Sequence, residues 1–98
     1  MDQALPPEET ATVRSILDSY QSRGVRYHAL RSRQAAARRF LVAHLLVPGT
    51  WTIRHGHNLA EEIEAEVARA LPNSNIVTHL EPADDPISMR DVQIDRVD

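Results

Sequence analysis

The first quarter of the chain has apolar residues at the spacing of a helix. They recur at i, i+3, i+4 and i+7, which places them on one helical face. These residues are Val13, Ile16, Leu17 and Tyr20. Pro6 and Pro7 precede the pattern, and proline suits a first turn because its missing N–H would have no helical partner there. Gly24 follows it and can take the left-handed conformation that ends many helices. The pattern therefore predicts a first helix that ends near Gly24.

Two strand patterns follow this helix. In residues 25–33, Val25, Tyr27 and Ala29 alternate with Arg26 and His28, which predicts a partly exposed strand. Residues 40–47 are nearly all apolar, which predicts a strand buried on both faces. Residues 34–38 should connect the two strands, and the Pro-Gly pair at 48–49 should end the second one.

The rest of the pattern predicts a second helix and a third strand. Asn58 can cap a helix, and Glu61 follows three residues later as in a capping box, so residues 51–56 are expected to form a loop. Apolar residues then recur every four positions: Leu59, Ile63, Val67 and Leu71. Residues 76–81 resemble a strand, and Pro82 should close it because it cannot donate to a ladder. We expect one domain over residues 1–82 and a flexible acidic tail over residues 83–98.

The predicted order of elements is α-β-β-α-β, which is an α+β fold. The first two strands can pair as an antiparallel hairpin, whereas a helix between the second and third strands makes those two parallel. The expected result is a three-stranded mixed sheet with two helices on one face. The other sheet face would stay partly apolar, and a second copy of the chain could cover it.

Composition narrows the range of functions. The chain has 98 residues and only 4% aromatic residues, so its small core must come from aliphatic side chains and oligomerisation would be a natural supplement. A net charge of -3 argues against general binding of nucleic acid. Without cysteine there is neither a disulfide nor a thiolate metal site. No apolar stretch reaches the roughly 18 residues of a membrane span, so the chain is expected to be soluble as it stands.

Four side chains that can bind metals fall near one edge of the predicted sheet. The C-terminal ends of parallel strands meet there, beside the start of the helix that connects them, and ligand sites favour this edge. The four are His44, His57, His79 and Glu81. Imidazole and carboxylate together suit Zn²⁺ and similar divalent transition metals. The sequence therefore predicts a divalent metal site, with Zn²⁺ as the first expectation.

Simpler interpretations stay open for the same residues. A buried His44 can be satisfied by a backbone carbonyl, and Glu81 can form an ion pair with His79. Six arginines around the hairpin could bind phosphates or lipid head groups, although a solvated face is the default: Arg23, Arg26, Arg31, Arg33, Arg38 and Arg39. Trp51 is expected to pack over the end of the sheet. We expect no enzyme, because the chain has no strong nucleophile motif and no evident general base.

Four short motifs are arranged in an order that resembles a known family. They are H-x-L-R-x-R from His28, the strand histidine His44, G-H-x-L-A-E around His57, and H-x-E-P from His79. With them, residues 24–82 resemble the C-terminal cytoplasmic domain of cation diffusion facilitator (cation efflux) transporters. Some members have a further histidine near the end of the second helix, where this chain has Arg69, so a binuclear site is in doubt.

The resemblance implies a ferredoxin-like, metallochaperone-like fold and a homodimer on the cytoplasmic side of the inner membrane. It implies divalent metal ligands at His44, His57, His79 and Glu81, near the dimer interface. Metal binding would favour a closed dimer and so regulate a divalent metal cation/proton antiporter through its transmembrane domain. The alternative is a dimerisation or docking module of the same fold that needs no metal.

Overall fold

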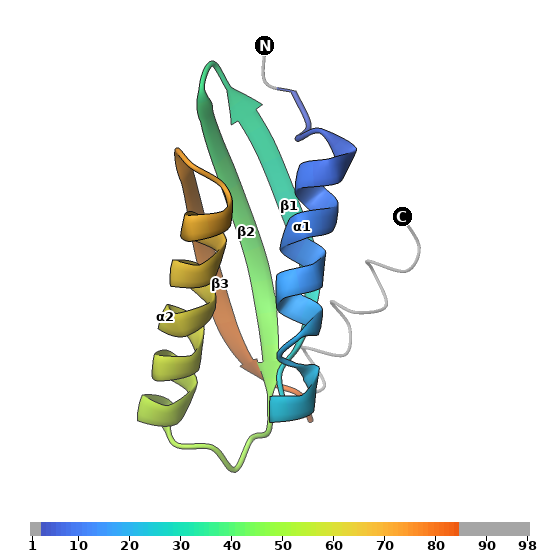
Figure 1. Ribbon diagram of the computed structural model, residues 1–98. Coiled ribbons are helices and arrows are strands. Elements are labelled where there is room, and N and C mark those ends of the chain that lie inside the picture. Colours follow the sequence, from blue (N-terminus) through green and yellow to red (C-terminus); the bar gives the residue numbers. More distant parts are fainter. Residues whose placement is uncertain (1–2, 85–98) are drawn as a thin grey trace.

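The computed structural model describes residues 3–84. Its elements follow the predicted α-β-β-α-β order, with one short 3-10 helix added after the first helix (Figure 1). They are α1 (Pro7–Asp18), η1 (Gln21–Arg23), β1 (Arg26–Ala35), β2 (Arg38–Val47), α2 (Ile53–Ala70) and β3 (Ser74–Pro82). The predicted tail lies largely outside the described residues.

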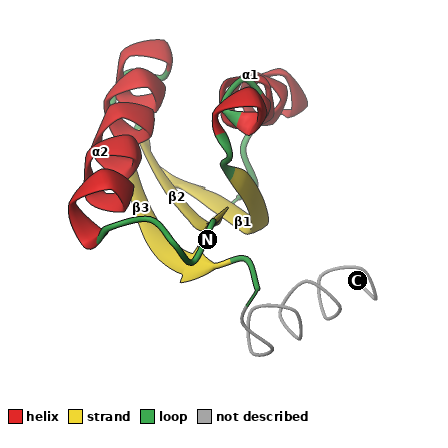
Figure 2. Cartoon of the chain, turned by 90° about the horizontal axis from the view of Figure 1, so that it is seen from below, coloured by secondary structure: helices red, strands yellow, loops and turns green. Residues whose placement is uncertain are grey.

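The three strands form one mixed sheet in the order β1-β2-β3. β1 pairs with β2 antiparallel, and β2 pairs with β3 parallel. Figure 2 shows both helices on the same side of this sheet. The predicted topology and the two-layer arrangement are therefore confirmed. Within residues 3–84, no helix covers the second sheet face, which we call the open face.

Alternation along β2 separates the two faces. Leu41, Ala43 and Leu45 are fully buried under the helices, whereas His44 and Val42 are only half-buried on the open face. The prediction that β2 is buried on both faces is thus wrong for the single chain. Strands and helices share one aliphatic core, as the composition indicates. Its fully buried members include Val13, Leu17, Val25, Leu41, Leu45, Ile63 and Val67.

The hairpin between β1 and β2 is longer and less regular than its pattern indicates. Its strands extend to Ala35 and from Arg38, so the predicted connection over residues 34–38 shrinks to a tight turn. The ladder also pairs His28 with His44 and Arg31 with Val42. Two residues of β1 therefore lie opposite one residue of β2, which is a β-bulge. This bulge lets Leu30 pack against the core, where unbroken alternation favours Ala29.

The second helix begins six residues earlier than predicted (58 − 52, counted between the N-caps). Its N-cap is Thr52, whose side-chain oxygen accepts a hydrogen bond from the backbone N–H of His55 at 3.0 Å. Asn58 lies inside the helix, and residues 53–56 of the predicted loop form its first turn. Two competing cap signals explain the error, because threonine and asparagine both favour the N-cap position. Gly56 faces β3, where an added Cβ would lie 3.1 Å from Leu80.

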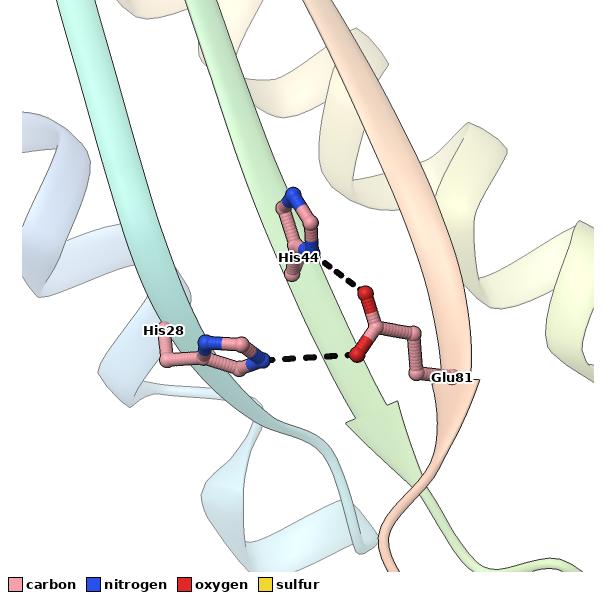
Figure 3. Close-up of side chains that lie close together, drawn as sticks. All are labelled: His28, His44 and Glu81. Atoms are coloured by element: carbon pink, nitrogen blue, oxygen red, sulfur yellow. Dashed lines mark hydrogen bonds and ion pairs between the residues drawn. The ribbon is translucent and has the colours of Figure 1, made fainter. Parts of the chain in front are cut away.

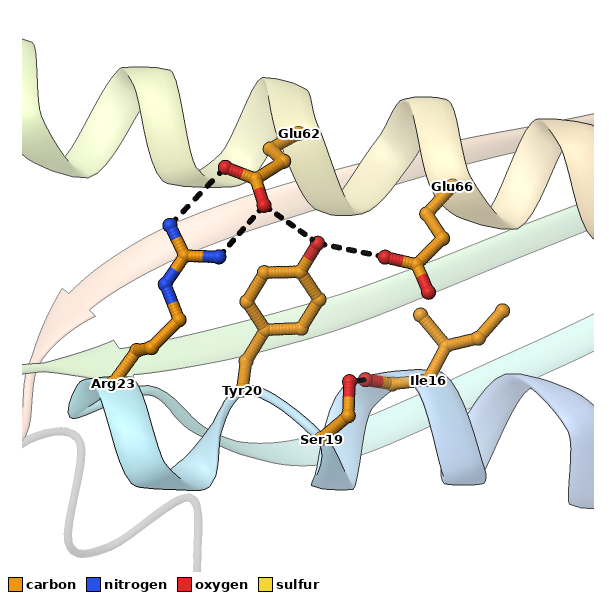
Figure 4. Close-up of polar contacts among 6 residues, drawn as sticks. All are labelled: Ile16, Ser19, Tyr20, Arg23, Glu62 and Glu66. Carbon is orange, nitrogen blue, oxygen red and sulfur yellow. Dashed lines mark hydrogen bonds and ion pairs between the residues drawn. The ribbon is translucent and has the colours of Figure 1, made fainter.

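The predicted first helix is divided into α1 and η1. Gly24 ends the second of these with φ of 90°, the left-handed conformation expected of it. Polar contacts link the segment between α1 and η1 to α2 (Figure 4). The Tyr20 hydroxyl lies 3.1 Å from Glu62 and 2.8 Å from Glu66. Arg23 binds the same Glu62 at 2.7 Å. The two helices are therefore joined by a buried aromatic ring that carries a polar end.

None of the helices within residues 3–84 combines the length and the apolar character that crossing a bilayer requires.

Candidate metal centre

A row of three histidines crosses the open face, with one residue from each strand. His28 pairs with His44 across the antiparallel ladder, and His44 pairs with His79 across the parallel one. The ring centroids of His28 and His44 are 5.2 Å apart, and those of His44 and His79 are 5.0 Å apart. Strand pairing thus places three imidazoles side by side, although 51 positions separate the first from the last in the sequence (79 − 28).

Glu81 joins this row from β3, two residues beyond His79. One carboxylate oxygen contacts Nδ1 of His44, and the other lies 3.5 Å from Nε2 of His28 (Figure 3). Each of the three residues offers one ligand atom, and these atoms all lie within 4.8 Å of one another. His28 is buried and the other two are half-buried. The carboxylate therefore bridges two imidazoles that belong to two other strands.

The chemistry of this donor set fits a borderline divalent metal ion. Two imidazole nitrogens and one carboxylate oxygen are the ligands of many zinc sites, and three protein ligands leave a position open. The carboxylate supplies one negative charge against the two charges of the ion. His79 lies beside His44 and is exposed, so it is the nearest imidazole available as a further ligand.

The four residues predicted as ligands do not all meet in one chain. His44 and Glu81 are in contact, and His79 lies next to them in the row. His57 is elsewhere, because α2 packs on the sheet face opposite the cluster. Its exposed ring lies 3.7 Å from Glu61, one helical turn along. Metal binding by any of these residues stays a prediction.

His28 belongs to the cluster, but the sequence analysis did not select it as a ligand. The sequence pattern identified His28 only as a polar position in an alternating strand and as part of a family motif. Continued without a bulge from the turn, where Ala35 pairs with Arg38, the antiparallel ladder would place His28 opposite Leu45. The bulge shifts that register by one residue, so sequence spacing alone misplaces the pair.

Trp51 packs at the end of the sheet, as predicted, where it is partly buried against the core. Its ring stacks on that of His55, with centroids 3.9 Å apart. Trp51 and Glu81 both line a cleft of about 220 Å³, together with Val47 and Leu80.

Residues 5–83 match the family model of the cytoplasmic domain of cation efflux proteins. The chain belongs to this family, so the resemblance noted in its motifs is confirmed.

Curated relatives support the same assignment. The chain is 46% identical over 88 residues to an uncharacterized transporter of Synechocystis sp., covering 90% of this chain and 28% of the relative. It is 34% identical over 83 residues to the cation-efflux pump FieF of Citrobacter koseri, covering 84% of this chain and 27% of the pump. The chain thus spans little more than a quarter of the length of these relatives.

Solved structures agree with the fold. The Zn form of CzrB is 37% identical, with a TM-score of 0.75 over 84% of this chain and 93% of that chain. The metal-bound C-terminal domain of the CzcD transporter from Thermotoga maritima has a TM-score of 0.73 at 18% identity, over 81% of this chain and 92% of that chain. This second likeness bears on the fold alone.

Proposed function

We propose that this chain is the metal-sensing and dimerisation domain of a divalent metal cation/proton antiporter. The observation that carries the proposal is the convergence of His28, His44 and Glu81 on the open sheet face. Zn²⁺ is the proposed ion, because two imidazoles and a carboxylate suit it and because the similar CzrB has a solved Zn form. The membrane-spanning part of the transporter is the proposed partner for the regulatory signal.

The position of the cluster connects metal binding to dimerisation. It lies on the face that the helices leave uncovered within the described residues, so a second copy that packs on this face also packs on the cluster. A ligand shifts a conformational equilibrium only when it binds one state more tightly than the other. Ligands supplied from both copies would give the closed dimer this advantage, and the transporter would respond to the ion through closure.

The predicted residues outside the three-residue cluster have distinct roles in this proposal. His79 is the next ligand within the same chain, reached by a change of its exposed rotamer. His57 serves only if the second copy presents α2 to the open face, because the sheet separates it from the cluster in its own chain. His57 is therefore the proposed ligand that makes the site depend on dimerisation.

Calorimetric titration with zinc, after removal of metal with a chelator, tests the site. We expect His28→Ala, His44→Ala and Glu81→Ala each to weaken zinc binding by at least tenfold, the size of loss seen when supporting groups of metal sites are removed. His55→Ala is the matched control, since this histidine stacks on Trp51 outside the cluster. Parent-like binding in all three cluster variants would rule out the site.

A second candidate is dimerisation that needs no metal. The open face carries the half-buried Phe40 and Val42, and Val77 on the same face is 47% exposed. Exposed apolar groups on a sheet face favour burial against a partner. Light scattering with zinc and with chelator separates the candidates, because a dimer of unchanged size and compactness under both conditions favours this one.

We propose no catalytic role. The matched family consists of cytoplasmic domains of cation efflux proteins, and the curated relatives named above are transporters.

A further inference from the structure

The β-bulge in β1 immediately follows His28, the most buried member of the cluster. Ala29 and Leu30 lie opposite Ala43 alone, since His28 pairs with His44 and Arg31 with Val42. Ala29 has φ of 55°, in the left-handed region. A residue with a Cβ is disfavoured there, and the corresponding position of one common bulge type is normally glycine. The backbone is therefore strained next to a proposed metal ligand.

The cluster requires His28 to reach across a whole strand. Neighbouring strands lie about 4.8 Å apart, so β1 and β3 are separated by roughly 10 Å with β2 between them. Side chains that stand straight up from a flat sheet would keep about that separation. Nevertheless, Nε2 of His28 lies 3.5 Å from the carboxylate of Glu81 (Figure 3). The side chains of His28 and Glu81 must therefore lean toward each other above β2.

A bulge bends its strand and increases the local twist, so it can set the direction of the side chain next to it, which here is His28. We propose that Ala29 is a positioning residue for the metal centre: its left-handed backbone forms the bulge that turns His28 toward Glu81. This inference rests on the proposed metal-binding function. Strained backbone tends to persist where the surrounding structure uses it, and the position of Ala29 fits that tendency.

The chain contains a matched control for backbone strain. Ala36, in the turn between β1 and β2, has the same residue type and the same φ of 55°. It lies at the far end of the hairpin, next to the paired residues Ala35 and Arg38, away from His28. Valine strongly disfavours positive φ because its Cβ is branched. Valine at position 29 or 36 therefore imposes a similar backbone penalty at two places, only one of which adjoins the cluster.

Zinc titration of these variants tests the proposal. We expect Ala29→Val to weaken zinc binding about 10- to 100-fold, as loss of a supporting interaction does in other metal sites. Ala29→Gly, which tolerates the bulge, should keep the parent affinity within about threefold, and so should Ala36→Val. The double variant His28→Ala/Ala29→Val should bind no more weakly than His28→Ala, because residue 29 acts through His28.

Parent-like affinity of Ala29→Val, or a loss that adds fully to that of His28→Ala, would overturn the proposal. If Ala29→Val does not fold, deletion of Ala29 is the second variant. The deletion restores one-to-one pairing and keeps His28 and Leu30 on their present faces, so the same loss of affinity is expected from it.

A measurement without metal separates this proposal from the proposed function. In the parent, Glu81→Gln should change the NMR chemical shifts of the His28 ring nitrogens, because the two groups are close. In the Ala29→Val background the same substitution should leave those shifts unchanged, and an equal response in both backgrounds would overturn the positioning role. Failure of the parent to bind zinc would instead contradict the proposed function alone.

Discussion

His28 and His44 occupy paired positions on β1 and β2, and their rings lie 5.2 Å apart on the open face of the sheet. Neither residue approaches the other through local sequence. The pairing comes from the hairpin register, and Glu81 then contacts both rings from the third strand. A site built in this way depends on all three strands at once, so binding at the site and stability of the sheet should be linked.

Zinc should therefore stabilise the folded domain. A ligand that binds only the folded state at 100 times its Kd adds about 2.7 kcal/mol to the free energy of unfolding. We expect this gain for the parent in urea unfolding followed by circular dichroism. Glu81→Ala should lose most of the gain, whereas Glu61→Ala, on the exposed side of α2, should keep it. Equal gains in all three proteins would show that zinc acts elsewhere.

Two variants, one at Thr52 and one at Asn58, test which residue is the N-cap of α2. Thr52→Ala removes the oxygen that accepts from the N–H of His55, so it should lower the free energy of unfolding by about 1 kcal/mol. Asn58→Ala should be neutral or slightly stabilising, because alanine is the better residue within a helix. Urea unfolding measures both. The opposite ranking would place the start of the helix at Asn58.

Tyr20 should contribute through its hydroxyl as well as its ring. The residue is 4% exposed, and its hydroxyl contacts Glu62 and Glu66 (Figure 4). Burial and these carboxylates raise the pKa of Tyr20 far above its ordinary value, so the phenol stays protonated and donates a hydrogen bond to one carboxylate at a time. We expect Tyr20→Phe to lower the free energy of unfolding by about 1 kcal/mol.

Tyr27→Phe is the control for this variant, measured by the same urea unfolding. The hydroxyl of Tyr27 accepts a hydrogen bond from Arg14 at an exposed position, where water can replace it. Its loss should therefore change the free energy of unfolding by only a few tenths of a kcal/mol. If the two phenylalanine variants are equally stable, the contact between Tyr20 and α2 adds nothing beyond packing.

The contact between Glu9 and Arg39 should make stability depend on pH in acid. Arg39 donates to both carboxylate oxygens, at 2.6 and 3.0 Å, and these hydrogen bonds lower the pKa of Glu9 below its ordinary value of 4.5. In the unfolded chain the pKa of Glu9 returns to 4.5. As the pH falls, Glu9 therefore binds its proton in the unfolded state before it does so in the folded state. The stabilisation is complete above the unfolded pKa and is lost as the pH falls through the lowered pKa.

Urea unfolding at several pH values between about 6 and 3 checks this effect. Glu9→Gln should lose stability less steeply in acid than the parent does, because the titrating group is gone. The neighbouring Glu8→Gln should keep the slope of the parent, since Glu8 is exposed in the same first turn. A parent-like slope in Glu9→Gln would show that other groups carry the acid sensitivity.

Sequence periodicity was enough to order the elements and to assign most of the core. Val13 and Leu17 lie on the helical face that the pattern selects, and Leu41 and Leu45 lie on the buried face of β2. These assignments succeed because helices and strands expose side chains with fixed local periods, so burial of one face is visible in the sequence itself. The start of α2 was missed because Thr52 and Asn58 both favour an N-cap, and local sequence does not choose between them.

The amino-acid sequence by itself determined the kinds of elements, their order, the absence of thiolate ligands and two of the three side chains in the histidine–carboxylate cluster. Only the tertiary structure decided that His28 completes the cluster with His44 and Glu81, and that His57 lies on the other side of the sheet. The physical reason is that contacts between strands depend on register. The bulge at Ala29 shifts the register of β1 against β2 by one residue, and the local sequence pattern does not show this shift. A helix likewise shows which of its faces is apolar, but which side of the sheet it covers is settled only when the whole core packs.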